Sequence, residues 1–326
     1  MPILVTGATG FVGWHVARLL RERDAEVRCL VRPGSPTDRL APLGVEVVRG
    51  DLRDAESLRA ACQGCAQVYH VAADYRLWAA DPQDLYRSNV EGTRALLDAA
   101  ESAERIVYTS TVGCLGLHAD HTPADEDTPV TVDDMIGDYK RSKYLAEALV
   151  RERAQAGQPI VIVNPSTPVG DGDVKPTPTG QTIVDFLRGR MPGFVNTGLN
   201  LVDVRDVAAG HLLAMERGQL GERYILGHRN LTLEQILAIL AELTGRPRPR
   251  FRVPFALAYA AAYVDNFVNL KLRHRPPGIP LDGVRMARHF MWFSAAKAVR
   301  ELGLPQTPVD AALRRAVDWY RGAGYA

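Results

Sequence analysis

Tyr139 and Lys143 could carry out acid–base chemistry together, because their i,i+4 spacing places both side chains on one face of a predicted helix. Upstream, the segment Tyr108-Thr109-Ser110-Thr111 ends a predicted strand in hydroxyl-bearing residues. The phenol could exchange a proton with a carbonyl or alcohol oxygen, and the nearby ammonium would lower the pKa of Tyr139 towards neutrality. The hydroxyl of Thr111 could orient the same oxygen. Together the three groups predict proton transfer at a carbon–oxygen centre.

A glycine-rich loop near the start of the chain could bind phosphate groups. Residues 6–13 read TGATGFVG and lie between a predicted strand and a predicted helix. Gly7 would make the tight turn, Gly10 would let a pyrophosphate approach the backbone, and Gly13 would let the helix pack closely on the strand. The free N–H groups and positive dipole of the helix N-terminus favour phosphate there. The loop predicts a dinucleotide site, the alternative being a turn with incidental glycines.

The residue after the second predicted strand indicates which dinucleotide binds. An NAD site usually has an acid there for the ribose hydroxyls, whereas this chain has Arg32, with Ser35 and Arg39 close by in the sequence. A guanidinium pairs naturally with a 2′-phosphate, so the predicted cofactor is NADP, with NAD as the alternative. Arg32 could also be an ordinary surface arginine. Asp51, after the third strand, could accept a hydrogen bond from the adenine amino group or merely support the following turn.

Short apolar runs alternate with helical patterns through the first half of the chain. This alternation predicts an α/β fold, a Rossmann-type doubly wound parallel sheet with helices on both faces. Asp54 is the predicted N-cap of one helix. Ligands of such sheets sit at the carboxyl ends of the strands, where the strand order reverses. The predicted strands span 3–5, 27–31, 45–48, 68–71, 105–110 and 160–163, and the predicted helices 11–23, 54–62, 85–100 and 139–155.

The second half of the chain has a different character. Residues 164–180 are rich in proline and glycine and are predicted to form a loop. A strand is predicted at 224–226. Residues 1–164 are therefore predicted to be the NAD(P)-binding domain, with return segments near 201–228, and residues 165–326 a smaller, mainly helical cap that binds substrate. The helices predicted in this half span 204–217, 233–244, 255–272 and 308–325.

The chain resembles an extended short-chain dehydrogenase/reductase along its whole length. The motifs are TGATGFVG at 6–13, GDL at 50–52, HVAA at 70–73, NVEGT at 89–93, YTST at 108–111 and YKRSK at 139–143. The resemblance implies that Tyr139 is the acid/base, Lys143 binds ribose and Thr111 polarises the substrate. Asn89 would hold active-site backbone or a water. The implied cofactor-binding residues are Gly7, Thr9, Gly10, Phe11, Val12, Gly13, Arg32, Asp51, Leu52, Ala72, Ala73, Tyr139, Lys143, Pro165 and Ser166.

Within the NAD-dependent epimerase/dehydratase family, the chain resembles hopanoid-associated sugar epimerases and dihydroflavonol-4-reductases in four stretches, 72–78, 164–170, 175–180 and 197–214. Related epimerases have an arginine in the run that is Leu199-Asn200-Leu201 here, and dehydratases have Asp-Glu where this chain has Val112-Gly113. We therefore expect NADPH-dependent reduction of a carbonyl in a largely uncharged or lipid-linked substrate. The substrate-binding residues would be Asp74, Tyr75, Arg76, Trp78, Thr167, Lys175 and Thr177.

Two other functions remain open from the sequence. One is a sugar epimerase associated with hopanoid biosynthesis, which would work by transient oxidation with bound NAD(P). The other is a regulatory protein that binds NADP without catalysis, which the intact pair Tyr139 and Lys143 disfavours.

Composition and smaller motifs bear on partners and location. The formal net charge of +1 predicts no nucleic-acid partner, and the absence of a signal peptide or long apolar run predicts a cytoplasmic protein. A lone C-x-x-C at Cys62 and Cys65 and eight scattered histidines predict no metal site. The resemblance implies a homodimer through helices 85–100 and 144–150. Helix 255–272, with a basic exit, is predicted to be a buried cap helix, the alternative being weak association with a membrane surface.

Overall fold

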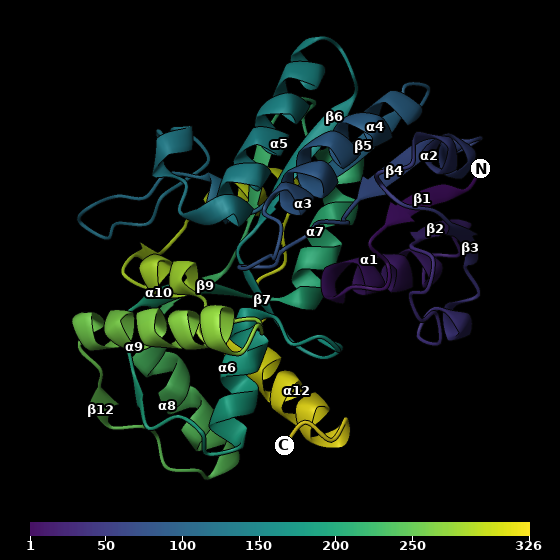
Figure 1. The fold of residues 1–326 in the computed structure, drawn as a ribbon. Coiled ribbons are helices and arrows are strands. Elements are labelled where there is room, and N and C mark those ends of the chain that lie inside the picture. Colours follow the sequence, from purple (N-terminus) through teal and green to yellow (C-terminus); the bar gives the residue numbers. More distant parts are fainter.

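A seven-stranded parallel sheet organises the first part of the computed structural model, which describes residues 1–326 (Figure 1). Its strand order is β10-β6-β5-β4-β1-β2-β3, so the order reverses between β1 and β4. The predicted Rossmann-type sheet and its seven strands are confirmed. The strands are β1 (Ile3–Thr6), β2 (Val27–Val31), β3 (Glu46–Arg49), β4 (Gln67–His70), β5 (Arg105–Thr109), β6 (Ile160–Pro165) and β10 (Arg223–Leu226).

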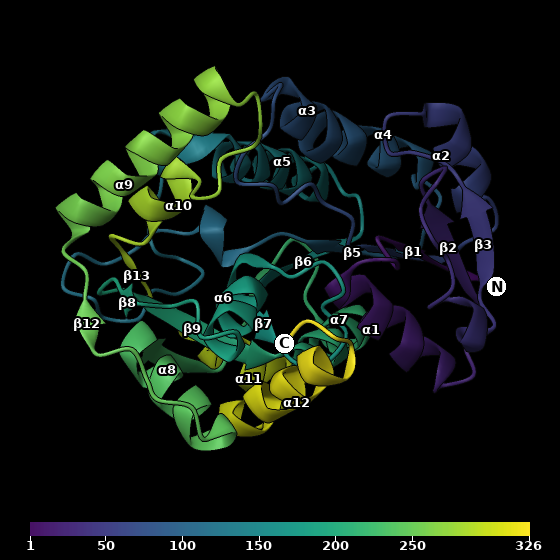
Figure 2. The ribbon, with the colours of Figure 1, turned by 60° about the horizontal axis from the view of Figure 1, so that its bottom comes forward.

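Helices cover both faces of this sheet. Figure 2 shows α2 (Ala55–Cys62), α4 (Gly92–Ala99) and α5 (Gly137–Gln155) on one side and α1 (Phe11–Arg21) and α7 (Val204–Arg217) on the other. Apolar side chains of alternate strand positions fill the two separate cores, so every residue of β6 is buried. Asp54 caps α2 as predicted, because its carboxylate accepts the N–H groups of Glu56 and Ser57.

The helix predicted at 85–100 is continuous in direction but changes its winding. It consists of α3 (Gln83–Tyr86), a π-helical turn (Arg87–Glu91) and α4. Short 3₁₀ turns occur at Ala41–Leu43, Val132–Asp134 and Val112–Cys114, the last of which directly follows Thr111. Single π-helical turns inside α-helices, such as Arg87–Glu91, often occur at functional sites.

The remaining residues form a cap with its own core, built around α6 (Pro178–Leu187), α8 (Leu233–Thr244) and α12 (Val309–Gly322). The interpretation of 164–180 as one loop was wrong, because β7 (Thr167–Val169) pairs with β9 (Gly198–Asp203) and α6 begins at Pro178. Strand β9 also pairs with β11 and β13. The short elements of the cap are β8 (Gly193–Phe194), β11 (Arg229–Thr232), β12 (Phe251–Arg252), β13 (Phe290–Met291), α10 (Leu281–Met286) and α11 (Ala296–Leu302), the last of which packs under the main sheet.

Helix α9 (Phe255–Phe267) continues into a π-helical turn, Val268–Leu272, at the outer edge of the cap (Figure 1). The helix exists as predicted, but its interpretation as a buried cap helix was wrong. Ala262 is the one buried residue of α9. The sequence pattern does not show which side of the helix faces the protein. No helix in the chain has the length and apolar character needed to cross a membrane.

Candidate active site

The glycine loop between β1 and α1 has the backbone shape that a pyrophosphate requires. Gly7 adopts φ +75°, and a Cβ there would lie 2.7 Å from the backbone nitrogen of Ala72. A Cβ on Gly13 would lie 2.6 Å from the carbonyl carbon of Gly7. Gly10 precedes α1, and no side chain caps this helix. The first N–H groups of α1 are therefore free for a phosphate, and the loop fits a dinucleotide.

The predicted cofactor residues around this loop lie where such a ligand would run. Thr9 and Gly10 are exposed, and Phe11 and Val12 form the first turn of α1. Ala72 and Ala73 follow β4, the strand beside β1 at the point where the strand order reverses. They are half-buried in the wall of this crevice.

At the end of β2, Arg32 is exposed, as a ligand-binding arginine would be. Asp51 lies near it, but its carboxylate accepts hydrogen bonds from the side chain of Arg53 at 3.0 Å and from the N–H of Arg53 at 2.9 Å. The Arg53 guanidinium is the main reason that the pKa of Asp51 lies below its usual value. Arg39 turns away, since it stacks 4.5 Å over the ring of Trp14 and donates to the carbonyl of Gly172.

Tyr139 and Thr111 meet at the carboxyl end of β5. Tyr139 lies in the first turn of α5, and Thr111 follows β5 and caps the 3₁₀ turn by accepting the N–H of Gly113 at 3.1 Å. Burial raises the pKa of Tyr139 well above its usual value, while a hydrogen bond with the hydroxyl of Thr111 opposes that rise. The phenol therefore stays protonated at neutral pH and can act as a proton donor.

The pKa of Tyr139 lies above its usual value and not near neutrality, contrary to the expectation, because burial of the phenol is the largest influence on it. The ammonium of Lys143 donates to the hydroxyl of Tyr108 at 3.0 Å and to the carbonyl of Thr109 at 2.9 Å. The side chain is buried, and burial lowers the pKa of Lys143 to about 8. The spacing correctly placed Lys143 beside the end of β5, but burial outweighs the attraction between the two groups.

Asn89 holds backbone next to the site. It lies in the π-helical turn, and its side chain accepts the N–H of Asp74 at 2.8 Å and donates to the carbonyl of Asp74 at 2.9 Å. It also donates to the hydroxyl of Ser142, which lies between Tyr139 and Lys143 on α5. Asn89 thus joins the loop after β4 to the helix that carries the phenol.

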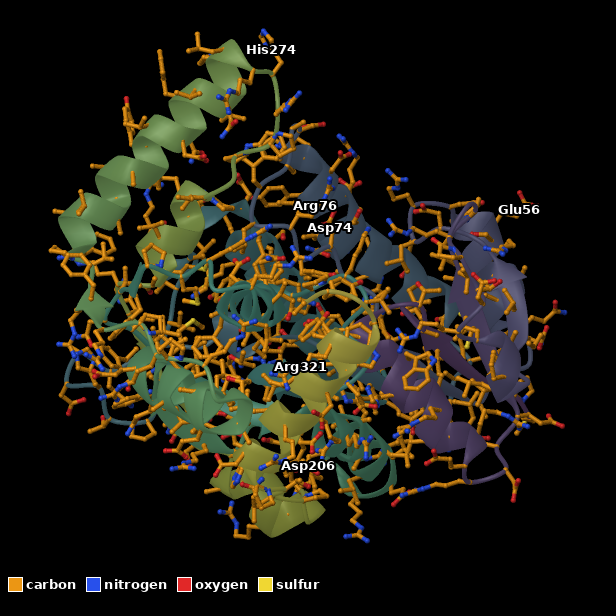
Figure 3. The ribbon with its side chains drawn as sticks, turned by 90° about the horizontal axis from the view of Figure 1, so that it is seen from below. Glu56, Asp74, Arg76, Asp206, His274 and Arg321 are labelled. Atoms are coloured by element: carbon orange, nitrogen blue, oxygen red, sulfur yellow. The ribbon has the colours of Figure 1, made fainter.

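The predicted substrate residues come from three segments. Asp74 and Arg76 form an ion pair at 2.6 Å, and Figure 3 shows both between the helices over the sheet and the cap. Tyr75 is exposed, and its pKa is raised by burial of its hydroxyl and then by the charges of Asp173 and Asp74. The loop after β4 therefore faces the loop that contains Asp173. Trp78 is half-buried at the end of the loop that follows β4.

One of the three predicted cap residues has a structural role, and the other two keep free side-chain groups. The hydroxyl of Thr177 caps α6 through the N–H of Gly180 and donates to Asp173 at 2.9 Å, so it is already used. Lys175 is exposed, and Thr167 is half-buried in β7. Lys175 and Thr167 keep side-chain groups that a ligand could contact.

The end of β6 has an unused polar group. The N–H of Ser166 bonds to the carbonyl of Leu226, but its buried hydroxyl has no partner. Pro165 ends β6 beside it, and the side chain of Asn164 donates to the carbonyl of Thr111 at 3.1 Å. A buried hydroxyl without a partner fits the amide group of a nicotinamide, which offers both a donor and an acceptor.

Two residues near the site were not identified from the sequence. His70 bonds to the hydroxyls of Thr6 at 2.9 Å and Thr93 at 3.1 Å, and burial lowers its pKa to about 3. Its position at the start of the HVAA motif was a signal for such a role. Lys140 is buried with one weak contact, 4.0 Å from the sulfur of Met291. No spacing rule identifies it, because it lies next to Tyr139 rather than four residues away.

Metal and disulfide chemistry have no visible basis in the chain. No group of three or more His, Cys, Asp or Glu side chains is placed to hold a metal ion. All four cysteines are free and buried, and burial raises the pKa of Cys62 at the end of α2 to about 12. A thiol of that pKa is a poor nucleophile at neutral pH.

Comparison with known proteins agrees with this geometry. Residues 3–227 match the NAD dependent epimerase/dehydratase family. A Synechocystis protein, whose name assigns it provisionally to the dihydroflavonol 4-reductases, is 51% identical and covers 98% of this chain and 95% of its own. Sterol demethylase protein B of Methylococcus capsulatus is 38% identical and covers 99% of each chain.

Solved structures show the same architecture. The crystal structure of gox2253 matches with a TM-score of 0.88 and 45% identity, over 99% of this chain and 98% of that one. The match extends through the cap as well as the sheet. The chain therefore belongs to the NAD dependent epimerase/dehydratase family and is an NAD(P)-binding enzyme of the extended short-chain dehydrogenase/reductase type.

Proposed function

We propose that this enzyme is an NADPH-dependent reductase of a carbonyl group in a largely uncharged, lipid-like substrate. The observation that carries the proposal is the phenol of the half-buried Tyr139 beside the hydroxyl of Thr111 at the carboxyl end of β5. A carbonyl oxygen placed between the two would accept a hydrogen bond from each. The nicotinamide, when bound, supplies the hydride.

The protonation states of this chain's residues suit the reductive direction. Hydride addition to a carbonyl leaves an alkoxide that must gain a proton. The raised pKa of Tyr139 keeps the phenol protonated, so it can donate that proton as the charge develops. Thr111 would orient the oxygen. Lys143, with a pKa of about 8, keeps its charge at neutral pH and would hold the ribose hydroxyls.

The preference for NADP rests on charges at the end of β2. Arg32 is exposed where an NAD site usually has an acid, and the nearby carboxylate of Asp51 is neutralised by Arg53. A 2′-phosphate would gain a charge-assisted bond there. NADH would gain nothing from Arg32.

The proposal of an uncharged substrate rests on β9. Asn200 is buried and uses its side chain to bond Asn230 at 2.7 Å and the carbonyl of Phe293 at 3.1 Å. The run Leu199–Leu201 therefore offers no cation to a nucleotide diphosphate. The name of the Methylococcus capsulatus relative points to sterol chemistry, which supports an apolar ring substrate.

Calorimetric titration with NADPH and NADH tests the cofactor assignment. We expect the unmodified enzyme to bind NADPH more tightly, and Arg32→Asp to weaken NADPH binding about ten- to hundredfold with little effect on NADH, as for loss of a hydrogen bond to a charged group. Arg314→Asp, an exposed arginine on α12, is the matched control. Equal affinity of the unmodified enzyme for both cofactors would overturn the preference for NADP.

A further inference from the structure

Helix α9 is oriented with Asp265 and Asn266 towards the chain segment around Ile279. The carboxylate of Asp265 accepts the N–H of Ile279 at 3.0 Å and the side chain of Asn269 at 2.8 Å. The side chain of Asn266 donates to the carbonyl of Ile279 at 2.8 Å. These bonds fix which side of the helix faces the protein. Its outward side is the apolar one.

The outward side of α9 and its neighbours forms a broad apolar surface, which we call the α9 face. Figure 2 places α9 at the outer edge of the molecule, with α10 on its inner side. Exposed apolar surfaces of this kind on soluble chains mark interaction sites. Its members and their exposed fractions are Phe251 60%, Leu257 56%, Tyr263 62%, Val264 59%, Phe267 55% and Leu272 66%.

The segment after Phe267 gives the C-terminal end of the α9 face a positive charge, and the segment that leads from α8 to α9 is also basic. Before α9, Arg246, Arg248 and Arg250 are exposed and form no salt bridge. After α9 come the exposed residues Lys271, Arg273, His274 and Arg275, and Figure 3 shows His274 at the outer tip of the molecule. Arg252 pairs with Glu234, so it adds no free charge. The carboxylate of Asp265, the one acid of the helix, accepts hydrogen bonds from the N–H of Ile279 and the side chain of Asn269.

We propose that the α9 face docks on the surface of an anionic lipid bilayer. The 13 residues of α9 make a rod of about 20 Å, shorter than the roughly 30 Å hydrocarbon layer, so the helix would lie in the plane of the interface. Its apolar side would enter the headgroup region, and the basic groups that follow the helix would meet lipid phosphates.

A second copy of the chain is a poorer occupant of this face. In a symmetric dimer the same patch must contact itself. Because the C-terminal end of the α9 face is basic, parallel pairing of two such helices would place these basic residues against their own copies. An anionic bilayer satisfies the apolar and the basic parts together.

The docked face would lie close to the reacting groups. Helix α10 packs between α9 and the start of α5, where a Cβ on Gly137 would lie 2.9 Å from the carboxyl carbon of Asp282 on α10. Gly137 is two residues from Tyr139. A lipid-like substrate would therefore have a short route from the bilayer to the phenol, although docking itself does not depend on the reaction.

Co-sedimentation with vesicles tests the proposal on the full chain without any substrate. We expect binding to vesicles of 70% phosphatidylcholine and 30% phosphatidylglycerol, and little binding to pure phosphatidylcholine. The partition coefficient of the double variant Val264→Glu/Phe267→Glu should be at least ten times lower than that of the parent. The matched control is Leu220→Glu/Val299→Glu, which changes two exposed apolar residues away from α9 and should bind like the parent.

Charge variants distinguish docking on anionic lipid from non-specific hydrophobic adsorption. Arg273→Gln/Arg275→Gln should weaken binding to the anionic vesicles about thirtyfold, at roughly fivefold per charge. Arg59→Gln/Arg314→Gln removes two exposed arginines elsewhere and should change little. Thermal melting checks that each variant is folded.

Three results would overturn the proposal. The first is no sedimentation of the parent with the anionic vesicles. The second is binding that Val264→Glu/Phe267→Glu leaves unchanged. The third is a parent that is oligomeric through the α9 face, shown by a shift to smaller species in sedimentation velocity when Val264→Glu/Phe267→Glu is introduced, because the face would then be covered by a second copy.

Discussion

At the scale of single residues, the proposal assigns to the phenol of Tyr139 the protonation of a nascent alkoxide. Tyr139→Phe keeps the ring in its packing and removes only the hydroxyl. We expect turnover to fall by about 10²–10⁴, the usual share of a general acid, with NADPH affinity nearly unchanged. Steady-state kinetics and calorimetry on the same preparation measure both quantities. A variant that turns over like the parent would show that another group donates the proton.

Lys143 makes a prediction about stability and pH. Its pKa is about 8 in the folded enzyme and about 10.4 in an unfolded chain. Between these values the unfolded chain binds more protons, so the contribution of Lys143 to the free energy of unfolding rises with pH, by about 3 kcal/mol at most. Below pH 8 the folded state bears the full cost of burying the ammonium.

Urea unfolding of the parent and of Lys143→Met at pH 8, 9 and 10 isolates this effect. The buried thiol of Cys29, whose pKa is raised to about 12, acts in the opposite direction in both proteins and cancels in the difference. We expect the stability of the parent relative to the variant to increase across this range. A constant difference would mean that Lys143 titrates near its ordinary value.

The sequence predicted which side chains gather at this site but not their electrostatics. The spacing of Tyr139 and Lys143 and the strand end at Thr111 were sufficient to place them together. The partner of Lys143 turned out to be Tyr108, and burial moved the pKa of Tyr139 upwards. Burial depends on the whole fold, so no local spacing can supply it.

At the scale of elements, the contact between the glycine loop and α1 is the tightest constraint on the cofactor site. A Cβ on Gly13 would collide with the backbone of Gly7, which cannot move without distorting the loop. We expect Gly13→Ala to lower the free energy of unfolding by about 1–3 kcal/mol and to weaken nucleotide binding sharply. Gly322→Ala, where nothing lies within 4 Å, is the control and should leave both unchanged.

Elements with local signals were predictable, and elements that depend on distant partners were not. The strands of the main sheet have continuous apolar runs, and Asp54 marks the start of α2. Strand β7 has three residues and exists because it pairs with β9, some 30 residues further on. The orientation of α9 depends in the same way on Ile279, which lies beyond its own C-terminus.

At the scale of the whole molecule, assembly and membrane docking would use different surfaces. The homodimer implied by the family resemblance would form through α4 and α5, whereas α9 lies beyond α10 at the edge of the cap (Figure 2). Leu145 is a large apolar residue on α5 that is 38% exposed. Sedimentation velocity at about 10 µM should show a dimer for the parent and a monomer for Leu145→Glu, whereas Val299→Glu on α11 should remain dimeric. A parent that is purely monomeric would contradict the dimer.

Transfer of deuterium from NADPH labelled at both C4 positions tests the central claim most directly. The enzyme is incubated with apolar cyclic ketones such as 5α-cholestan-3-one, and separately with UDP-glucose, and the products are analysed by mass spectrometry. A reductase places one deuterium on the carbinol carbon of an apolar ketone for each NADPH oxidised, and Tyr139→Phe should reduce this transfer at least a hundredfold. Epimerisation of the sugar nucleotide without net oxidation of NADPH would contradict the account, if no deuterium-labelled alcohol forms from any of the ketones.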